Sequence, residues 1–108
     1  MNRRRMAGVC AAAMLVLAGA VWAAEHVVSQ KGKAFSIKKL IVKVGDTVKF
    51  LNEDPFSHNI FSLSDAKSFD LGSYGPGQSK SVTFDKAGTV EVECAVHPDM
   101  KLVIEVTK

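Results

Sequence analysis

Four side chains that can bind a transition metal stand out by their types and spacing. Cys94, His97 and Met100 follow one another at three-residue intervals, and His58 lies on a separate segment upstream. Two imidazoles and a thiolate in a trigonal plane, with a weak thioether on the axis, form the ligand set of a blue-copper electron-transfer centre. The sequence therefore predicts that these four residues bind one copper ion that cycles between Cu(I) and Cu(II).

The first part of the chain has the pattern of an export signal. Three arginines at positions 3–5 precede an apolar stretch over 6–21, and Ala23 ends a small-residue cleavage motif. We expect a signal peptide over 1–23 and a periplasmic copper-binding domain over 24–108. An uncleaved membrane anchor is the alternative, although the apolar stretch is shorter than the roughly 18 residues of a spanning helix.

Removal of that segment changes the charge and the sulfur content of the domain. Three of the 14 basic residues are lost and none of the 11 acidic ones, so the domain is formally neutral and nucleic acid is disfavoured as a partner. Cys10 is also lost, which leaves Cys94 as the only cysteine and Met100 as the only methionine. An exported lone cysteine is a free thiol, an intermolecular bridge or a metal ligand. The three-residue spacing favours the ligand.

Period-two alternation and frequent turn signals predict a small all-β domain. We expect no stable membrane insertion of this domain after the signal peptide is cleaved. We expect about seven short strands in a Greek-key β-sandwich. The expected strands are 26–28, 34–44, 47–51, 57–63, 79–84, 89–93 and 101–106. Residues 65–78 are rich in Gly, Ser, Pro and Asp, which predicts a long surface loop. In this arrangement Cys94 ends one strand, Met100 lies where the next begins, and a neighbouring strand brings His58 to the same end.

The motifs around these residues resemble those of the cupredoxins, the family of small blue-copper proteins. The similarity rests on Ser-His58-Asn-Ile-Phe, on Glu-Cys94-Ala-Val-His97-Pro-Asp-Met100, and on the strand-forming segment 42–50. The two-residue spacings between the last three ligands are most similar to those of amicyanin-type members.

This resemblance implies a role for each matching residue. His58, Cys94 and His97 would be the equatorial ligands and Met100 the axial one, with Asn59 bracing the ligand loop by hydrogen bonding. His97 would be the ligand whose ring edge reaches the surface. The resemblance also implies a monomeric carrier that exchanges single electrons with transient redox protein partners, a donor and an acceptor, through a dry patch that includes Pro98.

Other functions remain as alternatives. A thiol hydrolase built on Cys94 and His97 would need an oxyanion site and an orienting group, neither of which the sequence indicates. An exported copper chaperone or storage protein would use the same soft ligands, but such proteins typically have several Met or Cys residues. A metal-free adhesion module would leave the ligand pattern unexplained. A metal with three strong ligands and an axial fourth has no open position for substrate, so we expect an electron carrier and not an enzyme.

Cleavage after Ala23 would create a second candidate metal site. The new N-terminus, Ala24-Glu25-His26, offers a free amine, two amide nitrogens and an imidazole at the third position. Such a set can hold Cu(II) or Ni(II) in a square plane. The alternative is that Val27 and Val28 draw this segment into the first strand.

Overall fold

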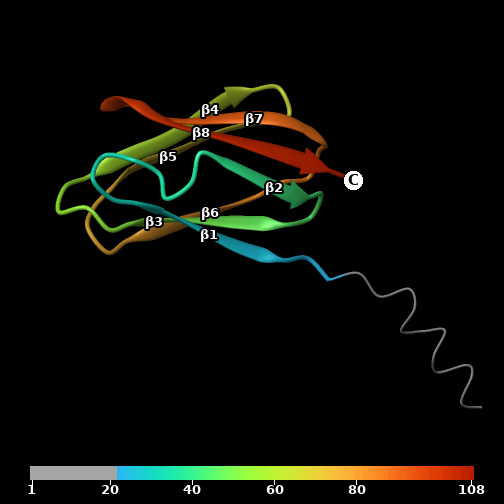
Figure 1. Cartoon of the computed structure of the whole chain (residues 1–108), viewed down its shortest axis with the longest axis horizontal. Coiled ribbons are helices and arrows are strands. Elements are labelled where there is room, and N and C mark those ends of the chain that lie inside the picture. Colours follow the sequence, from blue (N-terminus) through green and yellow to red (C-terminus); the bar gives the residue numbers. More distant parts are fainter. Residues whose placement is uncertain (1–21) are drawn as a thin grey trace, which may run out of the picture.

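The computed structural model describes residues 22–108, which form two β-sheets packed face to face (Figure 1). The strands are β1 (Glu25–Gln30), β2 (Lys39–Lys43), β3 (Thr47–Asn52), β4 (His58–Ser64), β5 (Lys67–Tyr74), β6 (Ser79–Thr83), β7 (Gly88–Cys94) and β8 (His97–Thr107). Within the described residues, no helix is long and apolar enough to cross a membrane. Most of the predicted signal peptide lies outside these residues, so its cleavage stays a prediction.

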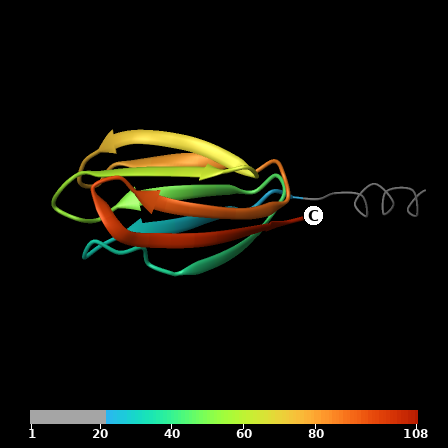
Figure 2. The ribbon, with the colours of Figure 1, turned by 90° about the horizontal axis from the view of Figure 1, so that it is seen from above.

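The strand order confirms the predicted fold class. The smaller sheet has the order β1-β3-β6 and the larger one the order β2-β8-β7-β4-β5. β1 runs parallel to β3 and β2 runs parallel to β8, whereas the other neighbours are antiparallel. The chain crosses between the sheets at every connection except β4–β5 and β7–β8 (Figure 2). The result is a Greek-key sandwich of eight strands.

The eighth strand is the part of the fold that the sequence reading missed. Residues 65–78 were expected to be a loop, but most of them form β5, an edge strand that pairs with β4 alone. Phe69 and Leu71 pack against the core, while Ser68 and Asp70 are exposed. Partly buried and exposed residues therefore alternate as in a strand. The pattern is hard to recognise in the sequence, because the apolar residues lie among Gly, Ser and Asp and the strand propensity of Gly and Asp is low.

Two other predicted boundaries are also corrected. The strand expected over 34–44 narrows to β2, because the segment before Lys39 makes only one isolated bridge, between Phe35 and Gln30. The last strand begins at His97 and not at residue 101, since the turn after Cys94 is only two residues long. The candidate ligands are thereby held closer to the sheet than a loose loop would hold them.

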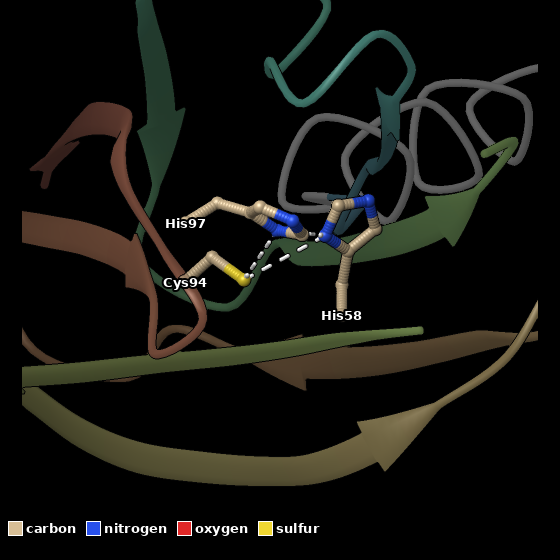
Figure 3. A group of neighbouring side chains, drawn as sticks. All are labelled: His58, Cys94 and His97. Atoms are coloured by element: carbon tan, nitrogen blue, oxygen red, sulfur yellow. Dashed lines mark hydrogen bonds between the residues drawn. The ribbon is translucent and has the colours of Figure 1, made fainter. Parts of the chain in front are cut away.

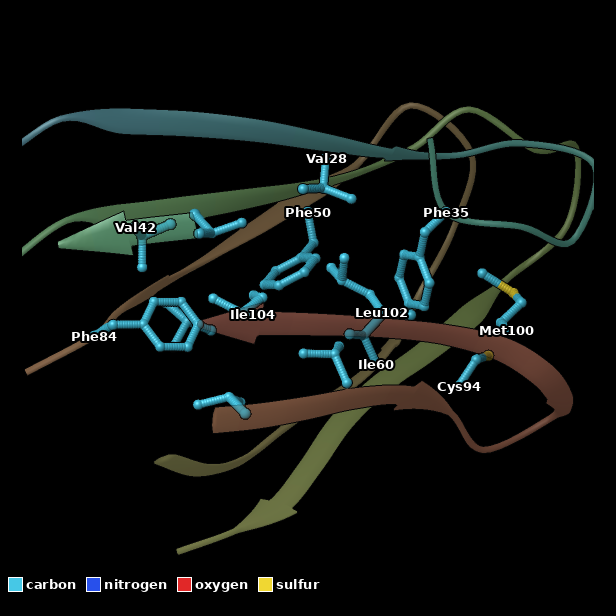
Figure 4. Packing of buried hydrophobic residues seen from close by; sticks show 14 of the residues in the cluster. Val28, Phe35, Val42, Phe50, Ile60, Phe84, Cys94, Met100, Leu102 and Ile104 are labelled. Atoms are coloured by element: carbon cyan, nitrogen blue, oxygen red, sulfur yellow. The ribbon is translucent and has the colours of Figure 1, made fainter. Parts of the chain in front are cut away.

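The core fills the space between the sheets and continues to one end of the sandwich (Figure 4). Large apolar side chains fill its middle, among them Phe50, Phe84 and Ile104. At one end, Cys94 and Met100 join the same cluster with 2% and 1% of their surfaces exposed. The two sulfur atoms thus lie against packed apolar side chains, an arrangement that keeps water away from them.

Candidate metal centre

Three strands of the larger sheet bring the predicted ligands to one end of the sandwich. His58 is the first residue of β4, Cys94 the last of β7, and His97 the first of β8. Cys94 and His97 face each other as a pair across the two-residue turn between β7 and β8. The amide of Ala95 in that turn donates a hydrogen bond of 2.9 Å to the carbonyl oxygen of Asn59 on β4. The backbones of all three strands are therefore tied together at this point.

The donor atoms of the three residues face one another (Figure 3). The Sγ atom of Cys94 lies 3.6 Å from Nδ1 of His58 and 3.7 Å from Nδ1 of His97, and the two Nδ1 atoms are 3.2 Å apart. A point equidistant from these three atoms lies about 2.0 Å from each, close to the roughly 2.0–2.3 Å bonds that imidazole and thiolate make to a metal such as zinc. This triangle has the size of a trigonal metal-binding plane, and its soft and borderline donors suit copper.

Met100 lies in β8, three residues beyond His97, and its side chain is buried beside Cys94 at the same end of the core (Figure 4). A thioether is a soft donor of the kind that favours Cu(I). All four residues predicted from the sequence therefore lie at one end of the fold. The donor set and the size of the triangle both fit a copper ion.

A buried carboxylate orients the first histidine. The Nε2 atom of His58 lies 2.7 Å from Oδ2 of Asp54, whose side chain is 4% exposed. The amides of Gly32 and Lys33 in the β1–β2 connection also donate to Asp54, at 2.6 and 3.1 Å. Burial by itself would raise the pKa of Asp54, but the hydrogen bonds from His58, Gly32 and Lys33 outweigh it and hold this pKa below its ordinary value. Asp54 is thus an anion that fixes Nε2 as the hydrogen-bonded nitrogen of His58 and leaves Nδ1 for the metal.

The loop that carries Asp54 is itself held by a buried amide. The side-chain nitrogen of Asn52 donates to the carbonyl oxygens of Phe56 and Tyr74, at 2.8 and 3.1 Å, and its side-chain oxygen accepts from the amide of Asp54 at 2.8 Å. Since Asn52 is fully buried, these bonds are shielded from competing water. The loop that leads into His58 is therefore rigid.

An aromatic ring packs against both imidazoles. The ring centroid of Phe56 lies 5.4 Å from that of His58 and 5.4 Å from that of His97. The ammonium group of Lys33 lies over the same ring, 5.8 Å from its centroid. Phe56 thus packs against both rings of the histidine pair, and a positive charge lies over its own ring.

His97 is the most accessible of the four residues. It is half-buried, whereas His58, Cys94 and Met100 are buried. Because its Nδ1 atom faces the cysteine, the opposite edge of its ring points away from the site. Val96 on one side of it is 60% exposed, and Pro98 on the other side is also exposed. Two exposed apolar residues therefore flank His97 in the chain.

Asn59 braces the ligand turn by hydrogen bonding, as the resemblance implied, but through its backbone and not its side chain. Its backbone carbonyl braces the ligand turn, while its side-chain nitrogen donates to Asp70 on β5 at 2.8 Å. The sequence reading also missed Asp54 and Phe56 altogether. The signal for Asp54 was a carboxylate four residues before a candidate ligand histidine, a pairing that is common around protein-bound metals.

Comparisons with known proteins agree with this geometry. A family model described as copper binding proteins of the plastocyanin/azurin family matches residues 23–107. Amicyanin from Paracoccus denitrificans is 35% identical over 77 residues, a match that covers 66% of this chain and 58% of amicyanin. This chain therefore spans less than two thirds of that relative's length.

Two solved structures show the same fold. A Cu-containing nitrite reductase from Thermus scotoductus superposes with a TM-score of 0.73 and 30% identity, over 78% of this chain and 22% of the enzyme. A mutant of amicyanin in its Cu(I) form gives a TM-score of 0.70 and 28% identity, over 76% of this chain and 81% of amicyanin. The family model, the relatives and the arrangement of donor atoms lead to one conclusion: the chain belongs to the plastocyanin/azurin family of copper-binding proteins.

Proposed function

We propose that the domain is an exported one-electron carrier in which His58, Cys94 and His97 bind one copper ion, with Met100 as the axial ligand. The observation that carries this proposal is the triangle of one Sγ and two Nδ1 atoms with sides of 3.2 to 3.7 Å. Copper bound there supplies a one-electron change between Cu(I) and Cu(II). The residues around it determine how easily that change occurs.

The protein residues keep the site in one geometry. Asp54 fixes the ring of His58, and the short turn after Cys94 is hydrogen-bonded to the strand that carries His58. Phe56 packs against the two imidazoles, and the apolar core around Cys94 excludes water from the sulfur. Because the ligands are held by the sheet, a change of charge on the metal requires little movement of the protein, which favours fast electron exchange.

The accessible edge of His97 is the proposed point of electron entry and exit. Val96 and Pro98 would frame a small apolar surface around it, suited to brief contacts with a donor and an acceptor protein. Transient redox complexes bury little area, so a small apolar contact surface is enough for them. We propose that the carrier is monomeric and acts in the periplasm after cleavage of residues 1–23.

The same geometry favours a carrier over the other candidate functions. Four protein ligands leave no open position for a substrate, so we infer that this domain is not an enzyme. The similarity to the nitrite reductase extends over 22% of that enzyme, about the size of one domain. A chaperone must release copper readily, whereas buried ligands on three hydrogen-bonded strands favour retention.

Addition of Cu(II) to the domain tests this proposal. We expect one equivalent to bind, an intense blue colour from thiolate-to-copper charge transfer, and reversible one-electron reduction. Cys94→Ser should lose both the colour and the tight binding, whereas His26→Gln, at the one histidine outside the proposed ligand set, should keep both. Rapid transfer of the copper to a Cu(I) chelator would favour the chaperone instead, and a colourless complex would refute the proposed site.

A further inference from the structure

A second buried carboxylate, Asp46, lies at the end of the sandwich opposite the metal centre. Its turn connects β2 to β3 and lies beside the C-terminal end of β8, because Val44 donates its amide to Thr107. The ligand His97 is at the other end of this strand of 11 residues, roughly 30 Å away. Asp46 therefore takes no part in the copper site.

Asp46 accepts three hydrogen bonds, from Ala24 just before β1, from His26 in β1 and from Lys43 in β2. The amide nitrogen of Ala24 lies 2.9 Å from Oδ1, while Nε2 of His26 and the amide of Lys43 lie 3.0 and 2.9 Å from Oδ2. The bonds from Ala24, His26 and Lys43 lower the pKa of Asp46 to about 2 despite its burial. The carboxylate is thus fully charged, and among the described residues the basic side chain in contact with it is the ring of His26.

The Asp46 carboxylate is the group near Ala24 that would stabilise a positive charge there. A shallow depression around it is lined by Trp22, Ala23, Ala24, His26, Lys43 and Lys108, among other residues, and Asp46 has the only acidic side chain there. In the intact chain Ala24 contributes a neutral amide to this anion. Hydrolysis of the Ala23–Ala24 bond adds a hydroxyl group to the carbonyl carbon of Ala23 and protons to the nitrogen of Ala24, which becomes an ammonium group.

We propose that Asp46 is the binding site for the α-ammonium group that a signal peptidase creates at Ala24. This inference adds to the proposed export of the chain and is independent of the copper site. The nitrogen is already held in place, because the carbonyl oxygen of Ala24 accepts from the amide of Thr47 at 3.0 Å and β1 pairs with β3 from Glu25 onward. Cleavage at this bond therefore turns a hydrogen bond from a neutral amide into a partly buried ion pair, without moving the strand.

The position of the cut matters in this inference. Ala18-Gly19-Ala20 is another small-residue motif, and cleavage after it would start the chain at Val21 and leave Ala24 as a neutral amide. Cleavage after Ala23 also removes Trp22, which is 88% exposed and is the only tryptophan of the chain. The ion pair at Asp46 can therefore form only if the cut falls after Ala23.

The same strand pairing disfavours the square-planar metal site predicted at Ala24-Glu25-His26. Successive amide nitrogens of an extended strand point to opposite sides, so those of Glu25 and His26 cannot both face one metal while β1 is paired. The ring of His26 is also bound to Asp46. In the folded protein Ala24 and His26 instead hold the start of β1 against Asp46.

A cycle of four proteins tests the inference. Two N-termini are compared, one at Ala24 and one a residue earlier at Ala23. Each is made with Asp46 and with Asp46→Asn, and all four proteins are loaded with copper. We expect the extra residue to lower the urea midpoint when Asp46 is present and to have no effect in Asp46→Asn. Equal effects in both backgrounds would overturn the proposal. Asp85→Asn is the matched control, because Asp85 is 72% exposed and its contact with Lys67 is loose at 3.6 Å.

Titration of the Ala24 ammonium group in the unmutated protein gives a second test that does not require Asp46→Asn to fold. Its pKa should lie about one pH unit above the ordinary 7.7–8.0 for this group. His26 on β1, Lys43 on β2 and Lys108 are the other titratable groups around Asp46. A raised pKa means that the added stability is present below pH 8 and is lost as the pH rises toward about 9. An ordinary pKa would refute the ion pair.

The exported protein gives the final check. N-terminal sequencing should find Ala24, and the mature protein should lack tryptophan fluorescence. A start at Val21 would overturn the proposed cleavage position and this inference with it. The blue colour is read separately in every variant, so a failure of the copper proposal would be recognised as such.

Discussion

The sharpest test of the metal centre is the substitution Asp54→Asn, which changes a partner of His58 and no ligand. The carboxylate accepts from Gly32 on Oδ1 at 2.6 Å, and from Lys33 and His58 on Oδ2 at 3.1 and 2.7 Å. Asparagine has one acceptor oxygen in place of two. If that oxygen keeps His58 and Lys33, the amide NH2 group faces the N–H of Gly32, and one buried charge-assisted hydrogen bond is lost.

The expected magnitudes follow from this loss. Removal of a hydrogen bond to a charged group costs about 1.5–3 kcal/mol of unfolding free energy. Loss of the carboxylate also makes His58 a weaker ligand, and such changes around a metal typically lower its affinity about 10- to 100-fold. Cu(II) should lose more than Cu(I), because the anion stabilises the higher charge. The reduction potential should then rise by about 60 mV for each tenfold difference between the two losses.

Three measurements test this prediction: Cu(II) affinity by competition with a chelator, the reduction potential by voltammetry, and stability by urea unfolding of the metal-free protein. Asp99→Asn is the matched control, since it removes the same charge from an exposed residue near His97. Solvent screens that charge, so its effect should be small. If both variants shift the potential equally, or if Asp54→Asn shifts nothing, the hydrogen bond to His58 has no role in tuning the site.

Three further predictions concern other parts of the molecule. Met100→Gln should keep the blue colour and lower the reduction potential, because a harder axial ligand favours Cu(II); an unchanged potential would exclude Met100 as a ligand. Tyr74→Phe should lower the unfolding free energy by about 1–3 kcal/mol, because the buried side-chain nitrogen of Gln30 loses its 2.6 Å hydrogen bond to the tyrosine oxygen. The double variant with Gln30→Met should recover most of this loss in urea titrations, and no recovery would contradict the prediction. The free energy of unfolding should fall as the pH drops below 3.8 toward the pKa of about 2 of Asp46, because this carboxyl binds protons more weakly in the folded state. Urea titrations at several pH values should show a weaker pH dependence for Asp46→Asn.

The candidate ligands could be predicted from the sequence because their chemistry is rare and local. Cys94, His97 and Met100 lie within seven residues, and two of them are the only residues of their type beyond position 23. His58 was harder to place, since only the predicted strand order brought it to the same end. The alternation of apolar residues likewise predicted most strands. β5 escaped because its two core residues, Phe69 and Leu71, lie among small and polar ones on an edge strand.

The residues that hold the ligands could not be predicted in the same way, and the reason is physical. Asp54 is fixed by the amides of Gly32 and Lys33, more than 20 residues away in the chain, and backbone donors leave no trace in the sequence. Asn52 is a turn-forming residue by composition, and only its complete burial makes it the support of the loop before His58. A ligand set can thus be recognised from residue types, whereas the rigidity on which its redox behaviour depends comes from contacts between distant segments. Asp54→Asn preserves every ligand and removes only a contact that holds one of them. This variant therefore separates the contribution of the ligand set from that of the contacts that keep it rigid.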